Sequence, residues 1–193
     1  MDLKKQSNGM NAIGTELKDS YVILSKTFED KRGFFMESFN LEQFHRIVGY
    51  DVEFVQDNHS KSKKGVLRGL HYQYDPPMGK LVRVIAGSGF DVVVDIRSDS
   101  STFGQHQSFF LSEENNRMVW VPAGFAHGFI ALENNTHLCY KTDALYNSNT
   151  EGSIYPLDSE LNIDWGIDIQ LILLSDKDRE AQSFGSYKKD TRF

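Results

Sequence analysis

The sequence contains a single cysteine and no long apolar run. Cys139 is the one cysteine among 193 residues, so no internal disulfide can form. This favours a reducing compartment and a cytoplasmic location. No stretch approaches the roughly 18 consecutive apolar residues of a membrane span. Residues 1–14 contain lysines but no apolar segment behind them, which argues against a secretory signal. We therefore expect no association with a membrane.

Positive charge is also scarce. The chain has 21 lysines and arginines against 27 aspartates and glutamates, a formal net charge of −6. Basic residues cluster only at residues 61–64, whereas a nucleic-acid-binding protein normally has a basic face. We therefore expect no nucleic-acid partner. An anionic small ligand is still possible, because a few arginines can converge inside a pocket.

The length and composition are those of one globular domain. Hydrophobic residues make up 39% and charged residues 25% of the chain, which is ordinary for a domain that buries a core. No internal repeat or linker divides the sequence. The first nine residues, MDLKKQSNG, are polar, and we expect a flexible extension over residues 1–9. The expected folded unit is residues 10–193.

Short apolar stretches separated by turn residues fill the middle of the sequence, which is typical of an all-β sandwich or barrel. Strands are expected at residues 66–74, 80–86, 89–96, 118–121, 128–132 and 138–142. The strands at 80–86 and 89–96, joined across Gly87-Ser88, are predicted to form a tight hairpin. Apolar spacing predicts a helix over Leu41–Val48. A capping-box pattern predicts a helical turn that begins near Ser175, with Asp178 at its third position.

Polar side chains are concentrated in four otherwise apolar segments, at residues 28–37, 56–60, 66–73 and 121–129. Unpaired buried charges are costly, so these side chains either point outward or line a ligand cavity. Taken alone, His71 is more often a structural histidine than a base. Ideal pleating would put Arg68 and His71 on opposite faces of a strand. A bulge at Gly69 would re-aim one of the two side chains.

Several motifs in register resemble those of a known family. GVLRGLHYQ, GKLVRV, DVVVDIRSDSSTFG and VPAGFAHGF occur in that order, followed by Tyr140-Lys141 and EGSI at residues 151–154. Over about residues 10–178 they resemble the dTDP-4-dehydrorhamnose 3,5-epimerase family. The resemblance implies an all-β cupin fold, a double-stranded β-helix (jelly roll) with a few short peripheral helices. It also implies a homodimer that uses neither a metal nor another cofactor.

The resemblance further implies roles for individual residues. His71 falls on the base that removes a proton from carbon, and Asp178 falls on the aspartate that orients this base. Tyr140 falls on the general acid at the opposite face, and Lys80 on the lysine beside the developing enolate. The substrate-binding positions fall on Arg32, Glu37, Gln56, Asn58, Arg68, Lys80, His127, Tyr146, Glu151 and Lys177, with Tyr146 as the aromatic that can stack on thymine.

The implied reaction converts dTDP-4-dehydro-6-deoxy-D-glucose to dTDP-4-dehydro-L-rhamnose by inverting C3 and C5 beside the C4 ketone. Such a reaction needs a base on one face, an acid on the other, and a positive charge near the enolate oxygen. Histidine suits the first role because its unperturbed pKa is near neutrality. Lysine suits the third role, and arginine suits recognition of the diphosphate.

Other functions remain open at this stage. A relative that acts at only one of the two carbons, or a 3,4-ketoisomerase on the same scaffold, would share much of this residue set. A sugar-binding cupin without catalysis is a further alternative. The metal-binding cupins require a second histidine two positions after the first, where this chain has Gln73. His71 and a distant His127 do not make a metal site.

Overall fold

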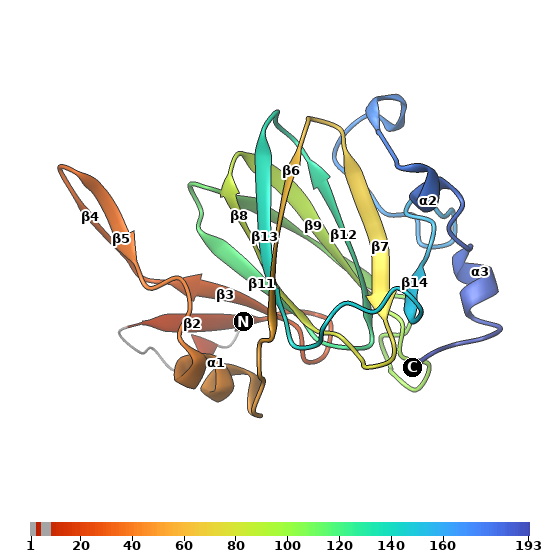
Figure 1. The fold of residues 1–193 in the computed structure, drawn as a ribbon, viewed down its shortest axis with the longest axis horizontal. Helices are drawn as coiled ribbons and strands as arrows, with labels where there is room; N and C mark the ends of the chain where they lie inside the picture. The colour runs from red at the N-terminus through yellow and green to blue at the C-terminus, as the bar shows by residue number, and fades with distance from the viewer. Residues whose placement is uncertain (1–2, 5–8) are drawn as a thin grey trace.

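The computed structural model describes residues 3–4 and 9–193. Two antiparallel sheets face each other and enclose the centre of the molecule (Figure 1). The larger sheet has the order β1 (Leu3–Lys4), β2 (Met10–Gly14), β3 (Tyr21–Ser25), β11 (Arg117–Val121), β8 (Lys80–Ala86), β13 (Thr136–Thr142) and β6 (Gln56–Ser62). The smaller has the order β10 (His106–Ser112), β9 (Ser88–Asp95), β12 (Phe125–Ala131), β7 (Leu67–Gln73) and β14 (Glu151–Ser153).

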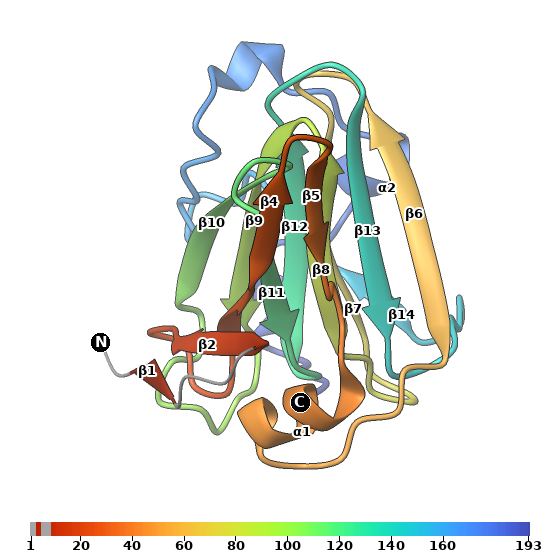
Figure 2. The same ribbon diagram turned by 90° about the vertical axis from the view of Figure 1, so that its left-hand side faces the viewer.

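The remaining elements are peripheral. Strands β4 (Thr27–Asp30) and β5 (Gly33–Met36) form a hairpin of their own, which we call the arm. Figure 2 shows the arm standing in front of the larger sheet, with α1 (Leu41–Val48) below it. The C-terminal segment contains only short helices, η1 (Ile169–Leu171), α2 (Asp176–Arg179) and α3 (Phe184–Tyr187). Within residues 3–4 and 9–193, no helix has the length and apolar character needed to span a bilayer.

The all-β prediction with short helices is confirmed, and strands occur at each of the six predicted places. Strand β12 begins at Phe125, earlier than the predicted residue 128. Of the expected extension over residues 1–9, residues 1–2 and 5–8 lie outside the described residues, while Leu3–Lys4 pairs with β2. The predicted helix at Leu41–Val48 has the expected bounds. Asn40 accepts a hydrogen bond from the Gln43 N–H at its start, and Gly49 ends it in a left-handed conformation.

The predicted hairpin between residues 80–86 and 89–96 is wrong. Strand β8 pairs with β11 and β13 in the larger sheet, whereas β9 pairs with β10 and β12 in the smaller one. Gly87, with φ of 73°, turns the chain from one sheet to the other. Consecutive strands on opposite sheets are a feature of jelly rolls, and both strands gain apolar partners inside the sandwich.

Apolar side chains pack in three layers around these sheets. Val82, Val119, Val93 and Phe129 belong to a cluster between the two sheets. A second cluster covers the outer face of the smaller sheet, where Trp165, Phe184 and Tyr187 of the C-terminal segment pack on β7, β9 and β12. A third packs α1 against the larger sheet through Phe44 and Trp120. The smaller sheet is therefore buried on both faces, which fixes the strands that carry the pocket described below.

Candidate active site

A pocket lies between the two sheets, and it consists of two adjoining chambers that share His71, Lys80 and Tyr140. The first, of about 300 Å³, is the Arg68 chamber, which also contains Ser60, Arg68, His127, Ser175, Lys177 and Asp178. The second, of about 200 Å³, is the Tyr146 chamber, which also contains Gln56, Asn58, Gln73, Tyr146 and Glu151. His71 comes from β7 of the smaller sheet and Tyr140 from β13 of the larger sheet. The two side chains therefore approach from opposite walls.

His71 is bonded to a buried carboxylate. Its Nε2 lies 2.6 Å from Oδ1 of Asp178, whose Oδ2 accepts a hydrogen bond from Oγ of Ser175 at 2.8 Å. Burial alone would raise the pKa of Asp178, but the hydrogen bonds from His71 and Ser175 outweigh it and hold that pKa below its usual value. Asp178 is therefore an ionised acceptor that fixes the orientation of the imidazole ring.

A β-bulge in β7 brings Arg68 and His71 into the same pocket. Arg68 lies opposite Phe129 of β12, and His71 lies opposite His127. Arg68 and His71 are three positions apart, whereas their partners are two positions apart, so β7 has one extra residue here. The extra residue falls at Gly69, where φ is 121° and an added Cβ would lie 2.6 Å from Cα of Gly128. Only glycine fits this backbone. The predicted bulge at Gly69 is confirmed.

A second histidine–carboxylate pair lies beside the first. Nε2 of His127 is 2.6 Å from Oδ2 of Asp91, and both side chains are buried. His127 is the direct cross-strand neighbour of His71. The other oxygen of Asp91, Oδ1, has no hydrogen-bond partner among the described residues. The pair therefore holds the His127 side chain in the lining of the Arg68 chamber.

Tyr140 and Lys80 both have shifted pKa values. Burial raises the pKa of Tyr140, and the charge of Glu151 adds to this while Arg68 opposes it. The phenol therefore keeps its proton at neutral pH. Burial lowers the pKa of Lys80 from 10.5 to about 8, against the negative charges of Glu151 and Asp91. Nζ of Lys80 donates to the backbone oxygen of His71 at 3.2 Å, and both side chains line the two chambers.

Glu151, Tyr146 and Lys177 form a connected group at the edge of the Tyr146 chamber. Oε2 of Glu151 accepts a hydrogen bond from the Tyr146 hydroxyl at 2.8 Å and also pairs with Nζ of Lys177. Burial would raise the pKa of Glu151, but these two partners and the nearby His71 together lower it. Glu151 is therefore ionised, and its charge is already engaged within the protein.

The polar side chains of β6 line the pocket from the larger sheet. Nε2 of Gln56 donates to Oδ1 of Asn58 at 2.9 Å, and Oε1 of Gln56 accepts from the Tyr146 N–H at 3.1 Å. These bonds fix the two amides beside Tyr146. In the Arg68 chamber, Nε of Arg68 donates to Oγ of Ser62 at 3.1 Å. The remaining guanidinium nitrogens have no hydrogen-bond partner within residues 3–4 and 9–193, so they can meet an anionic ligand.

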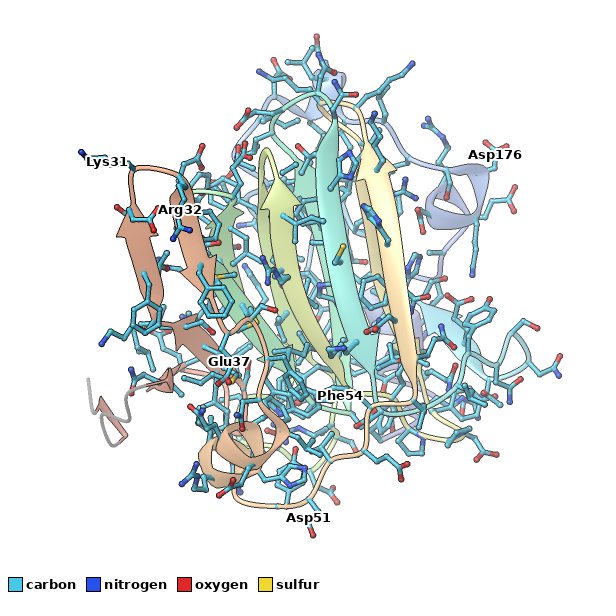
Figure 3. All side chains as sticks on the ribbon, turned by 60° about the vertical axis from the view of Figure 1, so that its left-hand side comes forward. Lys31, Arg32, Glu37, Asp51, Phe54 and Asp176 are labelled. Carbon is cyan, nitrogen blue, oxygen red and sulfur yellow. The ribbon has the colours of Figure 1, made fainter. Side chains whose placement is uncertain are left out.

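Arg32 and Glu37 lie outside this pocket. Arg32 is at the tip of the arm, where its guanidinium pairs with Asp30 and its side chain is 89% exposed. Glu37 lies at the base of the arm and accepts a hydrogen bond from Nε2 of Gln43 at 2.9 Å. Figure 3 shows both on one side of the larger sheet, with Asp176 of α2 on the opposite side. The structure therefore does not bring these two predicted residues together with the other eleven, which surround the pocket.

Three side chains of the pocket were not predicted. Asp91 is an acidic residue in the apolar strand FDVVVD, and the cost of a buried charge implies a partner such as His127. Ser175 was predicted only as a helix cap, yet its hydroxyl also donates to Asp178. Ser60 has a buried hydroxyl without a hydrogen-bond partner among the described residues and lines the Arg68 chamber. Ser60 lies in the polar segment at residues 56–60, but nothing in that segment distinguishes it as a pocket residue.

The ligand set of a metal-binding cupin is not assembled in the described part of the chain. Gln73 occupies the position of the second histidine, and its amide instead donates to the backbone oxygens of Pro76 and Leu145 and accepts from the Asn147 N–H. Within the same residues, no group of three or more His, Cys, Asp or Glu is arranged to hold a metal ion.

The fold and the pocket define a class of enzyme. A jelly-roll sandwich holds a histidine–aspartate pair and a protonated tyrosine on opposite walls, and a lysine lines the same two chambers. This arrangement can remove a proton from one face of a bound molecule and return one to the other face.

Comparisons with known proteins agree with this class. The dTDP-4-dehydrorhamnose 3,5-epimerase family model matches residues 14–186. The dTDP-4-dehydrorhamnose 3,5-epimerase of Shigella flexneri is 53% identical over 176 residues, which cover 91% of this chain and 96% of the relative. The crystal structure of the dTDP-6-deoxy-D-glucose-3,5-epimerase of Legionella pneumophila in complex with dTDP-4-keto-L-rhamnose is 48% identical. It covers 90% of this chain and 92% of that chain, with a TM-score of 0.87.

One solved relative is a single-carbon enzyme. The crystal structure of a 3′-monoepimerase from Streptomyces bikiniensis in complex with dTDP-quinovose is 33% identical, with a TM-score of 0.86. It covers 91% of this chain and 88% of that chain. The chain belongs to the dTDP-4-dehydrorhamnose 3,5-epimerase family and is an enzyme of the isomerase class with a cupin fold. The resemblance noted in the sequence is thereby confirmed.

Proposed function

We propose that this enzyme converts dTDP-4-dehydro-6-deoxy-D-glucose to dTDP-4-dehydro-L-rhamnose by inverting C3 and C5 one after the other, in either order. The observation that carries the proposal is the placement of His71 and Tyr140 on opposite walls with Lys80 beside them. The carbons on either side of a ketone are the positions where a proton can be removed with formation of an enolate. A sugar held between the two walls can therefore exchange a proton on one face for a proton on the other.

His71 is the proposed base. Its imidazole takes the proton from carbon while Asp178, kept ionised by its hydrogen bonds, stabilises the imidazolium that forms. Tyr140 is the proposed acid. Its raised pKa keeps the phenol protonated until the enolate carbon, a much stronger base, accepts the proton. Lys80 provides a positive charge beside the developing enolate oxygen. His127 contacts the sugar from the wall formed by the smaller sheet.

The nucleotide would occupy the polar edge of the pocket. We assign the diphosphate to Arg68 with Gln56 and Asn58, because the guanidinium plane and the amide donors suit phosphate oxygens. We assign the thymine ring to Tyr146, an aromatic residue that is 55% exposed. Each step moves only protons, so the proposed reaction calls on no cofactor. A cytoplasmic location for the folded unit at residues 10–193 is inferred from the single cysteine.

The pKa of Lys80 predicts an alkaline limit to activity. A lysine with a pKa of about 8 is half charged at that pH and neutral well above it. The stabilisation of the enolate is therefore lost as pH rises through about 8. We expect kcat/KM to fall over this range. In Lys80→Arg the fall should move to higher pH, because the guanidinium stays charged. Lys80→Met should retain a small activity without this fall. An unchanged alkaline limb in both variants would show that another group causes it.

We infer that the enzyme is a homodimer in which the arm of one subunit reaches the pocket of the other. Phe28, Phe34 and Phe35 of the arm are 51%, 56% and 71% exposed. Fully burying an exposed phenylalanine side chain contributes about 1.5–3 kcal/mol of stabilisation, so covering the arm is favourable. Arg32 at its tip and Glu37 at its base line neither chamber of their own chain, and Figure 3 shows both on the side of the larger sheet opposite to Asp176. An exchanged arm explains how both residues can contact substrate.

Mixing two inactive variants tests this exchange. Arg32→Ala and His71→Asn homodimers should each lose most activity. After subunit exchange, a heterodimer has one site with an intact His71 and an intact arm from its partner. We expect recovery of up to about a quarter of wild-type activity per chain, since half of the dimers are mixed and one of their two sites is complete. No recovery in dimers shown to be mixed would mean that the arm serves its own subunit.

A single-carbon epimerase is the second candidate, favoured by the similarity to the 3′-monoepimerase. Both activities need the same base and acid, so the product decides between them. Purified protein should convert dTDP-4-dehydro-6-deoxy-D-glucose to a product whose proton couplings show inversion at C3 and C5. Inversion at C3 alone would support the monoepimerase, and unchanged substrate would contradict both.

A further inference from the structure

Two consecutive residues of α2 are bonded to the same pair of strands. Asp178 binds His71 of β7, and Lys177 pairs with Glu151 of β14. Strand β14 is hydrogen-bonded to β7, with Ser153 opposite His71. The two side-chain contacts therefore join one helix to one rigid strand pair, side by side. Figure 1 shows α2 lying alongside β7 and β14.

Apart from these contacts, α2 makes few packing interactions with the sheet. It is four residues long, and Asp178 is its one buried residue. The chain is fixed to the smaller sheet on either side of α2, by the bridge of Leu173 with Val66 and that of Gln182 with Ile154. Between these bridges the helix has no apolar face against the sheet. A four-residue helix is not stable by itself, so its position depends on its side-chain contacts.

Glu151 has its carboxylate oxygen Oε2 engaged by protein partners. Its side chain is 15% exposed, against 56% for Lys177. One carboxylate oxygen, Oε2, serves both Lys177 and the hydroxyl of Tyr146. A continuous set of contacts thus runs from Tyr146, where the nucleotide is assigned, through Glu151 and Lys177 to the helix that carries Asp178.

We infer that Glu151 and Lys177 are positioning residues, whose ion pair holds α2 so that Asp178 stays bonded to His71. This rests on the proposed function, in which His71 is the base. The role differs from the direct substrate contact implied by family resemblance. A residue that only binds substrate alters KM, whereas one that aligns the base alters kcat. Because Tyr146 bonds to the same carboxylate, a nucleotide seated on Tyr146 would reinforce the alignment.

A double-mutant cycle tests the inference. Glu151→Gln and Lys177→Met should each lower kcat by about 10- to 100-fold with little change in KM. The double variant should be no slower than either single variant, because both remove the same contact. Lys177→Arg should keep most of kcat, since it can retain the ion pair. In an Asp178→Asn background, Lys177→Met should have no further effect.

An ion pair just after the next helix provides a matched control. Lys188, just after α3, pairs with Glu160 in the same way, but neither lines the pocket. Lys188→Met should leave kcat and KM unchanged. If the losses at Glu151 and Lys177 multiply, or if KM rises at constant kcat, the two residues bind substrate and the inference is wrong.

A measurement without substrate separates this inference from the proposed function. The amide protons of Arg179 and Glu180 are bonded to the backbone oxygens of Ser175 and Asp176. Hydrogen exchange over residues 174–181 should be faster in Glu151→Gln and Lys177→Met than in wild type or Lys188→Met. Equal exchange in all four proteins would overturn the inference. If wild type shows the expected exchange but no epimerisation, the proposed function fails while the role of the ion pair stands.

Discussion

Replacing His71 by asparagine is expected to lower kcat by about 10²- to 10⁴-fold, the range that loss of a general base produces. The imidazole of His71 faces the part of the pocket that the two chambers share. An ionised carboxylate, that of Asp178, fixes its orientation. Asparagine preserves the size and polarity of the side chain but cannot accept a proton from carbon. Steady-state kinetics with dTDP-4-dehydro-6-deoxy-D-glucose measures the loss.

The control for this variant is His106→Asn. His106 begins β10 and does not line either chamber, so its replacement should leave kcat unchanged. Binding of dTDP to His71→Asn should remain close to wild type, because the nucleotide is assigned to the other side chains of the pocket. If His71→Asn retained most of the wild-type turnover, the assignment of the base would have to be abandoned.

Replacing Tyr140 by phenylalanine is expected to separate proton removal from inversion. The enolate can still form, because His71, Asp178 and Lys80 are intact. Without the phenol, however, the wall of the larger sheet no longer carries the proposed acid. The proton then returns from the side of His71, and the original configuration is restored. We expect inversion to fall by about 10²-fold or more while exchange of the sugar proton with solvent falls much less.

Deuterium uptake into recovered substrate, compared with product formation, measures this separation. Tyr155→Phe is the matched control, since Tyr155 lies in the C-terminal segment and lines neither chamber. A parallel decline of exchange and inversion in Tyr140→Phe would contradict the assignment, because it would mean that the hydroxyl acts before the enolate forms.

The elements that could be predicted are those with a strong local pattern. Strand β8 is apolar at all positions except Lys80 and Arg83, and its bounds agree with the prediction at both ends. The helix at Leu41–Val48 has both an amphipathic spacing and a cap at each end. The bulge at Gly69 was predicted because Arg68 and His71 could not otherwise share a face. In each case the information lies within a few residues of the chain.

The elements that could not be predicted depend on distant partners. Strand β6, QDNHSKS, has no apolar face, because its inward residues Asn58 and Ser60 line the pocket instead of the core. The predicted hairpin after β8 failed because a glycine turn serves equally well to join two sheets. The place of Arg32 could not be predicted either, since the sequence does not show that residues 27–36 form a hairpin apart from the two main sheets.

The proposed enzyme removes protons from both carbons beside the ketone. To test this, the purified protein is incubated in deuterated water with dTDP-4-dehydro-6-deoxy-D-glucose, without added metal or nicotinamide, and the sugar protons are followed by NMR. We expect loss of the C3 and C5 proton signals as deuterium enters, together with a product of L configuration. If wild-type protein binds dTDP but C3 or C5 takes up no deuterium, the proposed function is wrong.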